Sequence, residues 1–276
     1  MTMVMTKKAT RQSAGRLTST LVIGKRSLLR FLRTPQLVVL GTVQGAMFLL
    51  IFRYVFGGAV GVSGLHYVDF LVPGYLTTGV LFTAMGAATG MAEDREQGFV
   101  DRLRSLPIPR SAVLAGRAAA DTGMLAWSLA TTTAIGFAVG FRIHGSPAQT
   151  AAALGLLVAF GFAFEWLFLA LGMLASNARA AQGLALLVFP LTFVSSAFVP
   201  VQTMPGWLQA VAEHQPLTVM IDAVRALTQG PAAAALLEHS AGWYMVRALA
   251  WATGIVATFA PLAMRDSAEG KDGNHG

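Results

Sequence analysis

The chain contains no cysteine and few charged residues. Asp, Glu, Lys and Arg make up only 12% of its 276 residues. The absence of cysteine excludes disulfides, thiolate metal sites and cysteine nucleophiles. The scarcity of charge, combined with 55% hydrophobic residues and 29 glycines, is typical of polytopic membrane proteins and not of soluble globular domains.

The sequence also lacks the motifs of several enzyme classes. Gly-x-x-x-x-Gly-Lys-Ser/Thr, the phosphate-binding pattern, does not occur, because the two Gly-Lys pairs are followed by Arg26 and Asp272. The five histidines lack metal-ligand spacing, and no serine lies in Gly-x-Ser-x-Gly. We expect no catalytic residue, metal or cofactor in this chain, and no binding of ATP by this chain alone.

Six apolar runs have about the 20 residues needed to cross roughly 30 Å of hydrocarbon. They cover approximately residues 36–56, 70–92, 113–139, 150–174, 181–199 and 243–264. The first follows a basic region and is too long for a signal-peptide core, so it reads as a retained signal anchor. We predict an all-α polytopic membrane protein with six transmembrane helices within residues 35–266.

The positions of the basic residues predict the orientation. With both termini in the cytoplasm, four of the 20 lysines and arginines lie outside, namely Arg53, Arg142, Arg225 and Arg247. Cytoplasmic loops of membrane proteins carry excess positive charge. We therefore expect a multi-pass protein of the plasma membrane with cytoplasmic termini. The charges lie beside the spans, so the net charge of +7 does not indicate a nucleic-acid partner.

The two terminal segments differ from the spans. Residues 1–34 are basic and carry leucines at helical spacing, which favours an interfacial elbow helix over a disordered basic tail. Pro35 marks a break before the first span, because a proline disfavours helical geometry in the residue before it. The cytoplasmic tail, 267–276, is polar and is expected to be disordered.

The longest loop, residues 200–242, falls outside in this orientation. Its segment 216–229 is apolar but carries Asp222 and Arg225. The segment is too short and too charged to span. A re-entrant or interfacial helix is therefore expected.

The connection between the second and third runs, residues 93–110, is a charged island in which eight of eighteen residues are charged. Phe99, Leu103 and Leu106 follow one another at intervals of four and three, so they share one face of a short helix. Gly98 and Pro107 bound that helix. An amphipathic helix of this kind can dock into a partner's groove. The alternative is a solvated loop whose arginines set the topology.

The sequence from Glu96 to Arg110, Glu-x-Gly-Phe-Val-x-Arg-Leu-Arg-Ser-Leu-Pro-Ile-Pro-Arg, resembles the second-to-third-span loop of type 2 ABC exporter permeases of the daunorubicin-resistance type. Segments 205–208, 213–216 and 222–227 are similar to that family's last exterior loop. The resemblance implies a transmembrane permease subunit, not an enzyme. Its implied partners are two copies of an ATP-binding subunit, which hold ATP and Mg²⁺, and a second permease copy or paralogue.

The resemblance further implies that the loop forms the coupling helix against the ATP-binding subunit. The implied contact residues are Glu96, Gly98, Phe99, Leu103 and Arg104. The implied function is the export of hydrophobic drugs, antibiotics or lipid-like compounds, with membrane lipids around the chain.

Glu165 lies near the middle of the fourth run, among aromatic residues. An ionised side chain at that depth costs roughly 2.5–3.5 kcal/mol even on the lenient insertion scale, so it is expected to face protein or a wet cavity. One hypothesis is a substrate-pathway contact for cationic amphiphiles, assisted by Phe162, Phe164 and Trp166. The other is a protonated or hydrogen-bonded residue that packs helices together.

Three further functions remain open from the sequence. A permease of the same architecture can export a glycan or lipid intermediate. An ion-coupled secondary transporter can use Glu165 without any ATPase. A membrane anchor can recruit a cytoplasmic protein through the charged loop and transport nothing.

Overall fold

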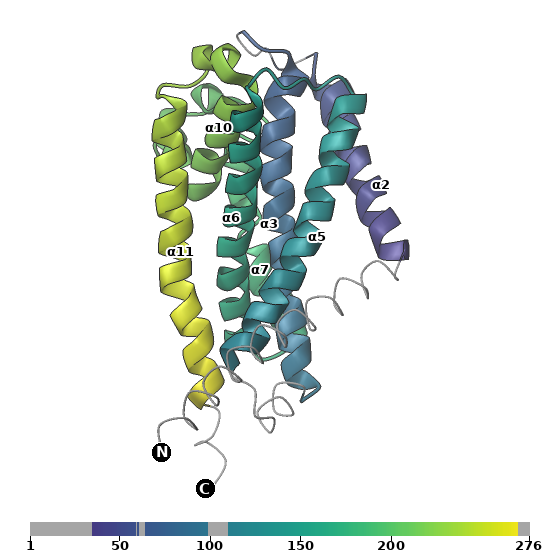
Figure 1. Ribbon diagram of the computed structural model, residues 1–276, viewed down its shortest axis with the longest axis vertical. Helices are drawn as coiled ribbons and strands as arrows, with labels where there is room; N and C mark the ends of the chain where they lie inside the picture. Colours follow the sequence, from purple (N-terminus) through teal and green to yellow (C-terminus); the bar gives the residue numbers. More distant parts are fainter. Residues whose placement is uncertain (1–34, 59, 61–63, 99–109, 270–276) are drawn as a thin grey trace, which may run out of the picture.

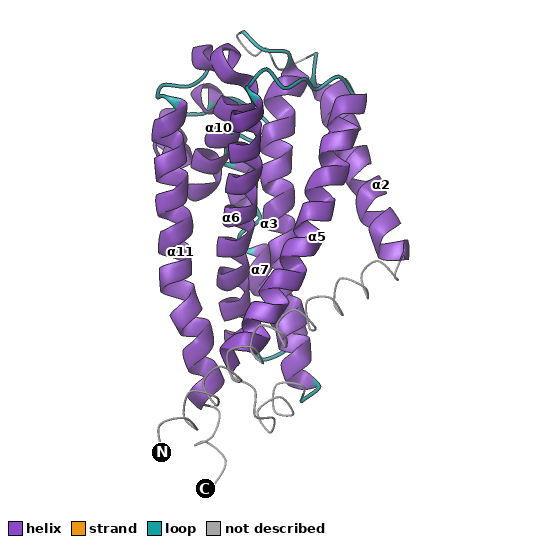
Figure 2. Cartoon of the chain, in the orientation of Figure 1, coloured by secondary structure: helices purple, strands orange, loops and turns teal. Residues whose placement is uncertain are grey.

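The computed structural model describes residues 35–58, 60, 64–98 and 110–269. Every regular element in these residues is helical (Figures 1 and 2). The all-α prediction is confirmed for this part of the chain. The expected elbow helix lies outside the described residues, as do Phe99, Leu103 and Arg104 of the charged loop.

Long helices running along one axis build the molecule (Figure 1). They are α2 (Pro35–Ile51), α3 (Tyr67–Glu96), α5 (Arg110–Ala138), α6 (Pro147–Leu174) and α11 (Ala241–Glu269). Helix α6 packs against α3 on one side and α11 on the other, while α5 and α2 lie toward the opposite edge. The buried core lies mainly along α3 and α6.

Three helices are long and apolar enough to cross a membrane: α3, α6 and the Ala241–Ala263 part of α11. Three shorter apolar helical stretches are Thr42–Phe56, Met124–Ala138 and Ala178–Phe193. These findings support a multi-pass membrane protein. The count of six spans stays a prediction.

Local sequence signals account for some of the helix ends. Helix α6 begins with a capping box in which the Ser146 hydroxyl accepts from the Gln149 N–H and the Gln149 side chain accepts from the Ser146 N–H. Helix α3 ends at Glu96, two residues before Gly98, whose φ of +66° favours glycine.

Hydrogen bonds between distant residues define the two ends of the bundle. At the Tyr67 end, the N–H of Arg142 donates to Asp69 Oδ1 at 2.9 Å. At the Glu96 end, Glu96 Oε1 accepts from the N–H of Ala178 at 3.0 Å. Helices α3 and α6 therefore run parallel to each other, both from the Tyr67 end to the Glu96 end.

The fifth apolar run is not one continuous helix. It forms α7 (Ala178–Leu186), a turn, and the four-residue α8 (Pro190–Phe193). Pro190 has no N–H to donate to the carbonyl of Leu186, which favours a break in the helix at this point. The run predicted over 181–199 thus coincides in part with the shorter apolar stretch Ala178–Phe193, which a turn interrupts, and its crossing of the membrane stays a prediction.

The region expected to form the long exterior loop is mostly helical. It contains the 3-10 helices η2 (Val201–Thr203) and η3 (Gly230–Ala235), and the α-helices α9 (Gly206–His214) and α10 (Pro216–Gln229). All residues of α10 after its first are buried, and α10 packs against α3, α6 and α11. Enclosure by protein is the condition under which a short polar-containing helix is tolerated at membrane depth.

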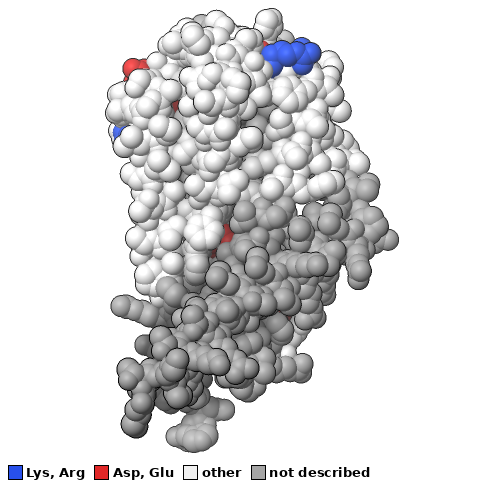
Figure 3. All heavy atoms as spheres, viewed as in Figure 1, with Lys and Arg blue, Asp and Glu red and all other residues white. Residues whose placement is uncertain are grey.

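The outer surface of the bundle is largely apolar. Figure 3 shows charged side chains at the Tyr67 end and an almost uncharged surface beside it on this face. Helix α11 exposes Val246, Leu249, Trp251 and Leu262. Such a surface suits contact with lipid.

Candidate functional site

A buried ion pair lies near the Tyr67 end. Arg225 Nη1 lies 2.6 Å from Asp222 Oδ1, three residues earlier on α10. The Arg225 side chain is 1% exposed and that of Asp222 12%. The spacing places both groups on one face of α10.

Arg225 joins three separate parts of the chain. Its Nη2 donates to the carbonyl oxygens of Ser196 at 2.7 Å and Phe70 at 3.2 Å, and its guanidinium lies 3.9 Å from the centre of the Phe70 ring. The Ser196 hydroxyl donates to Asp222 Oδ1 at 2.8 Å. Helices α3 and α10 and the segment after α8 are thus tied at one cluster.

Burial shifts the pKa values of both members of this pair toward their neutral forms. It raises the pKa of the Asp222 carboxyl, while Arg225 and the Ser196 hydrogen bond oppose that rise. Burial likewise lowers the pKa of Arg225, against the effect of Asp222. A buried pair of this kind stays charged only when its hydrogen bonds are satisfied.

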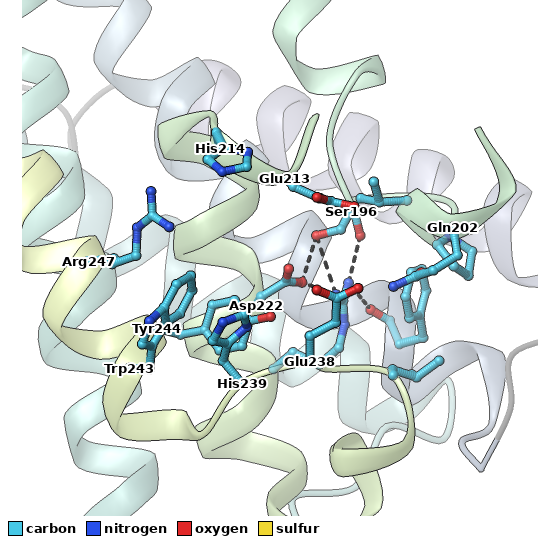
Figure 4. Close-up of a pocket in the computed structure, with 15 residues that line it drawn as sticks. Ser196, Gln202, Glu213, His214, Asp222, Glu238, His239, Trp243, Tyr244 and Arg247 are labelled. Carbon is cyan, nitrogen blue, oxygen red and sulfur yellow. Dashed lines mark hydrogen bonds and ion pairs between the residues drawn. The ribbon is translucent and has the colours of Figure 1, made fainter. Parts of the chain in front are cut away.

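Next to the ion pair is a cavity of about 190 Å³ (Figure 4). Its lining includes Glu213 of α9 and Trp243, Tyr244 and Arg247 of α11. The Arg247 guanidinium lies 4.6 Å from the Trp243 ring centre. The cavity therefore presents charges of both signs and aromatic rings at the Tyr67 end.

Glu165 is buried in α6, with 5% of its surface exposed. It lines a second, much smaller pocket between α3, α5 and α6, together with Asp121 of α5 and Phe162. Glu165 lies nine residues before the end of α6 and Asp121 eleven after the start of α5. At about 1.5 Å per residue, both lie roughly 13–17 Å from the Glu96 end. The structure thus brings two carboxylates from neighbouring helices to one pocket, which the sequence did not predict.

The aromatic residues predicted beside Glu165 divide into two environments. Phe162 is 39% exposed, whereas Trp166 is 8% exposed. Their ring centres lie 6.2 Å apart in an edge-on arrangement. Phe162 lines the Glu165 pocket, while Phe164 and Trp166 do not.

Of the five residues implied at the ATPase contact, two are described. Glu96 ends α3, and Gly98 follows it with a positive φ. The other three, Phe99, Leu103 and Arg104, are among those outside the described residues. Beside Glu96, Arg95 Nη1 donates to the carbonyl oxygens of Met173 and Ala175.

Sequence analysis missed the cluster around Arg225. Asp222 and Arg225 were noted as charges in an apolar segment and as part of the family-like segment 222–227, but not as a buried pair, and Ser196 was not singled out. The available signal was an opposite-charge pair at spacing three in an otherwise apolar segment. Such a pair is predicted to be buried together, but its partners on other helices follow only from the fold.

Within the part of the chain that the structure describes, no group of three or more His, Asp or Glu residues is placed to hold a metal ion.

The chain is similar to known transport proteins. Residues 18–228 match the family model of the ABC-2 type transporter. The chain is 35% identical over 241 residues to the daunorubicin resistance ABC transporter permease protein DrrB1 of Streptomyces coeruleorubidus, covering 87% of this chain and 82% of the relative.

Two further relatives are more distant. Identity is 26% over 261 residues with the probable doxorubicin resistance ABC transporter permease protein DrrC of Mycobacterium tuberculosis, covering 92% of this chain and 90% of that protein. It is 27% over 217 residues with the putative transport permease ycf38 of Cyanophora paradoxa, covering 75% and 72%.

Proposed function

Because the chain belongs to the ABC-2 type transporter family as a permease subunit, we propose that it exports hydrophobic drugs, antibiotics or lipid-like compounds across the plasma membrane. The similarity to the daunorubicin resistance permease over 87% of the chain carries this proposal. The chain has no phosphate-binding loop, and the family implies an ATP-binding partner. ATP hydrolysis in that partner would drive transport, and a second permease copy would complete the pathway.

The charged loop 93–110 is the proposed contact with the ATP-binding subunit. Its first four residues, 93–96, form the last turn of α3, Gly98 follows that helix, and its last residue, Arg110, is the first of α5. A segment between the ends of two long helices can transmit movement of a bound partner to both. Phe99, Leu103 and Arg104 supply the proposed contact within it.

The proposed substrate pathway includes the pocket of Glu165, Asp121 and Phe162. Two carboxylates and an aromatic ring in a largely apolar setting suit an organic cation with an apolar body. The same pair of carboxylates also favours a second candidate function, an ion-coupled secondary transporter that needs no ATPase. A glycan or lipid-intermediate exporter of the same family is the alternative within ATP-driven transport.

Co-purification with the candidate ATP-binding subunit tests the proposal. We expect the unaltered chain to retain that subunit and Leu103→Asp to lose it, because a charge on the apolar ridge prevents docking. The matched control is Ser176→Asp, which adds the same charge at an exposed position at the same end of the bundle. Failure of the unaltered chain to retain the ATPase would contradict the exporter proposal.

Transport in inside-out vesicles then separates the two candidate functions. We expect uptake of a cationic fluorescent dye to require ATP and to fall in Glu165→Gln, which removes the charge at nearly constant volume. Uptake of a neutral apolar dye should persist in that variant. Uptake driven by an ion gradient without the ATPase would support the secondary transporter instead.

A further inference from the structure

The last turn of α3 holds the ends of two other helices. Arg95 Nη1 donates to the carbonyl oxygens of Met173 and, at 3.2 Å, Ala175. These carbonyls belong to the end of α6, where backbone acceptors lack helical partners. A cation near a helix C-terminus is also favoured by the helix dipole.

Glu96, the next residue, forms a hydrogen bond with the start of α7. Its Oε1 accepts from the N–H of Ala178 at 3.0 Å. Ala178 is the first residue of α7, whose N-terminal N–H groups lack helical acceptors. Asn177 caps the same helix separately, because its Oδ1 accepts from the N–H of Ala180 at 2.8 Å. Arg95 and Glu96 thus link α3 to α6 and α7, with charge signs that match both helix ends.

Close packing prevents this junction from sliding. A Cβ at Gly172 would meet the carbonyl oxygen of Ala88 and, at 3.0 Å, the Met91 Cβ. Helix α6 therefore lies directly on the backbone of α3 at Ala88, about two turns before the junction. The end of α3 is thus connected to α6 by close packing and to the start of α7 by the hydrogen bond of Glu96.

The segment that begins with α7 is held at its other end as well. Arg225 binds the carbonyl oxygen of Ser196, and the Tyr67 hydroxyl donates to that of Phe198 at 3.1 Å. At Gly74 of α3, a Cβ would collide with the Ala197 backbone. The segment 178–198 thus connects the Glu96 end to the buried ion pair, with its break at Pro190 between them.

We propose that Arg95 and Glu96 are positioning residues that transmit movement of the charged loop to α7, and through it to the Asp222–Arg225 cluster. This inference rests on the proposed function and deepens it. In this proposal Glu96 contacts α7 within the chain, whereas the part of the loop after Gly98 contacts the ATP-binding subunit. Transmission therefore requires that the side chain at position 96 place a hydrogen-bond acceptor next to the Ala178 N–H. It does not require a negative charge that faces the ATPase.

Three variants separate transmission from docking and from simple helix capping. Glu96→Gln keeps an acceptor oxygen at the same distance from Ala178, whereas Glu96→Ala removes it. Asn177→Ala removes the other cap of α7 but leaves the link to α3. The measurement is the number of dye molecules transported per ATP hydrolysed, in proteoliposomes that contain the chain and its ATP-binding subunit.

We expect transport per ATP to fall about threefold to tenfold in Glu96→Ala, the range that corresponds to the net contribution of one ordinary hydrogen bond. Glu96→Gln and Asn177→Ala should stay within about twofold of the unaltered chain. Arg95→Ala should resemble Glu96→Ala, because it breaks the link to α6.

Two results would overturn the inference while leaving the exporter proposal intact. If Glu96→Gln loses the ATP-binding subunit in co-purification, or lowers transport per ATP as strongly as Glu96→Ala, the carboxylate acts by its charge and not as a hydrogen-bond acceptor for Ala178. If Asn177→Ala uncouples transport as strongly as Glu96→Ala, the role is only the stability of α7. Failure of the unaltered chain to retain the ATPase would instead remove the proposed function itself.

Discussion

Arg225 illustrates how a membrane protein keeps a charged side chain in its interior. Its partners come from three segments: the carboxylate of Asp222 and the carbonyl oxygens of Phe70 and Ser196. Removing one member of a buried charged network leaves the others without compensation, and this costs more than the pair itself contributes. A single change in the cluster is therefore expected to lower the stability of the protein by more than the intact cluster contributes to it.

We expect Arg225→Met to lower the free energy of unfolding by about 3–5 kcal/mol, because Asp222 would remain buried without its counter-charge. The thermal midpoint in detergent, followed by size-exclusion chromatography with fluorescence detection, measures this. Arg247→Met is the matched control, since Arg247 stacks on Trp243 and its loss should cost about 1 kcal/mol or less. Equal shifts in the two variants would contradict a stabilising role for the buried cluster.

At the scale of helices, the contact between α3 and α6 depends on a residue without a side chain. Gly172 of α6 lies against Ala88 and Met91 of α3, and there is no room for a Cβ. Gly155 lies on the same helix and has open space around it. The two glycines therefore differ only in what surrounds them.

Gly172→Ala is expected to destabilise the bundle by about 1–3 kcal/mol, because the backbone of α3 cannot yield to the added methyl. Gly155→Ala should be neutral or stabilising by up to about 1 kcal/mol, since alanine favours a helix. Thermal midpoints of both variants in the same detergent provide the comparison. Equal stability of the two variants would show that α6 can move away from α3 at low cost.

Composition and periodicity predicted where most long helices lie but not how the rest of the chain packs. The predicted runs 70–92 and 150–174 fall within α3 and α6, because about 20 apolar residues are a strong signal. The break at Pro190 could have been predicted from the sequence, since proline often interrupts helices. The enclosure of α10 by α3, α6 and α11 could not be predicted from the sequence, because it depends on contacts between residues far apart in the chain.

The same limit applies to the candidate sites. Glu165 stood out because a carboxylate is rare within an apolar run. Asp121 lies on another helix, and only the fold brings it to the same pocket. Glu96 was assigned through a family resemblance, and its hydrogen bond to Ala178 joins residues 82 positions apart. The sequence alone identifies unusual residues, whereas the residues that they contact can be identified only once the arrangement of the helices is known.

For the whole molecule, the orientation in the membrane decides whether the proposed coupling is feasible. The Glu96 end includes the charged loop and Ser176, and the Tyr67 end includes Ala234, which is exposed on η3. The bias of Lys and Arg predicts that the Glu96 end faces the cytoplasm. The absence of native cysteine means that a single introduced cysteine is the only thiol in the chain.

We expect Ala234→Cys to react with a membrane-impermeant maleimide on intact cells, because its exposed position would lie outside. Ser176→Cys should react only after the membrane is permeabilised, which also shows that the residue is reachable. The reverse pattern would place the charged loop outside the cell. No cytoplasmic ATPase could then contact that loop, so the coupling proposal and the transmission through Glu96 would both be wrong.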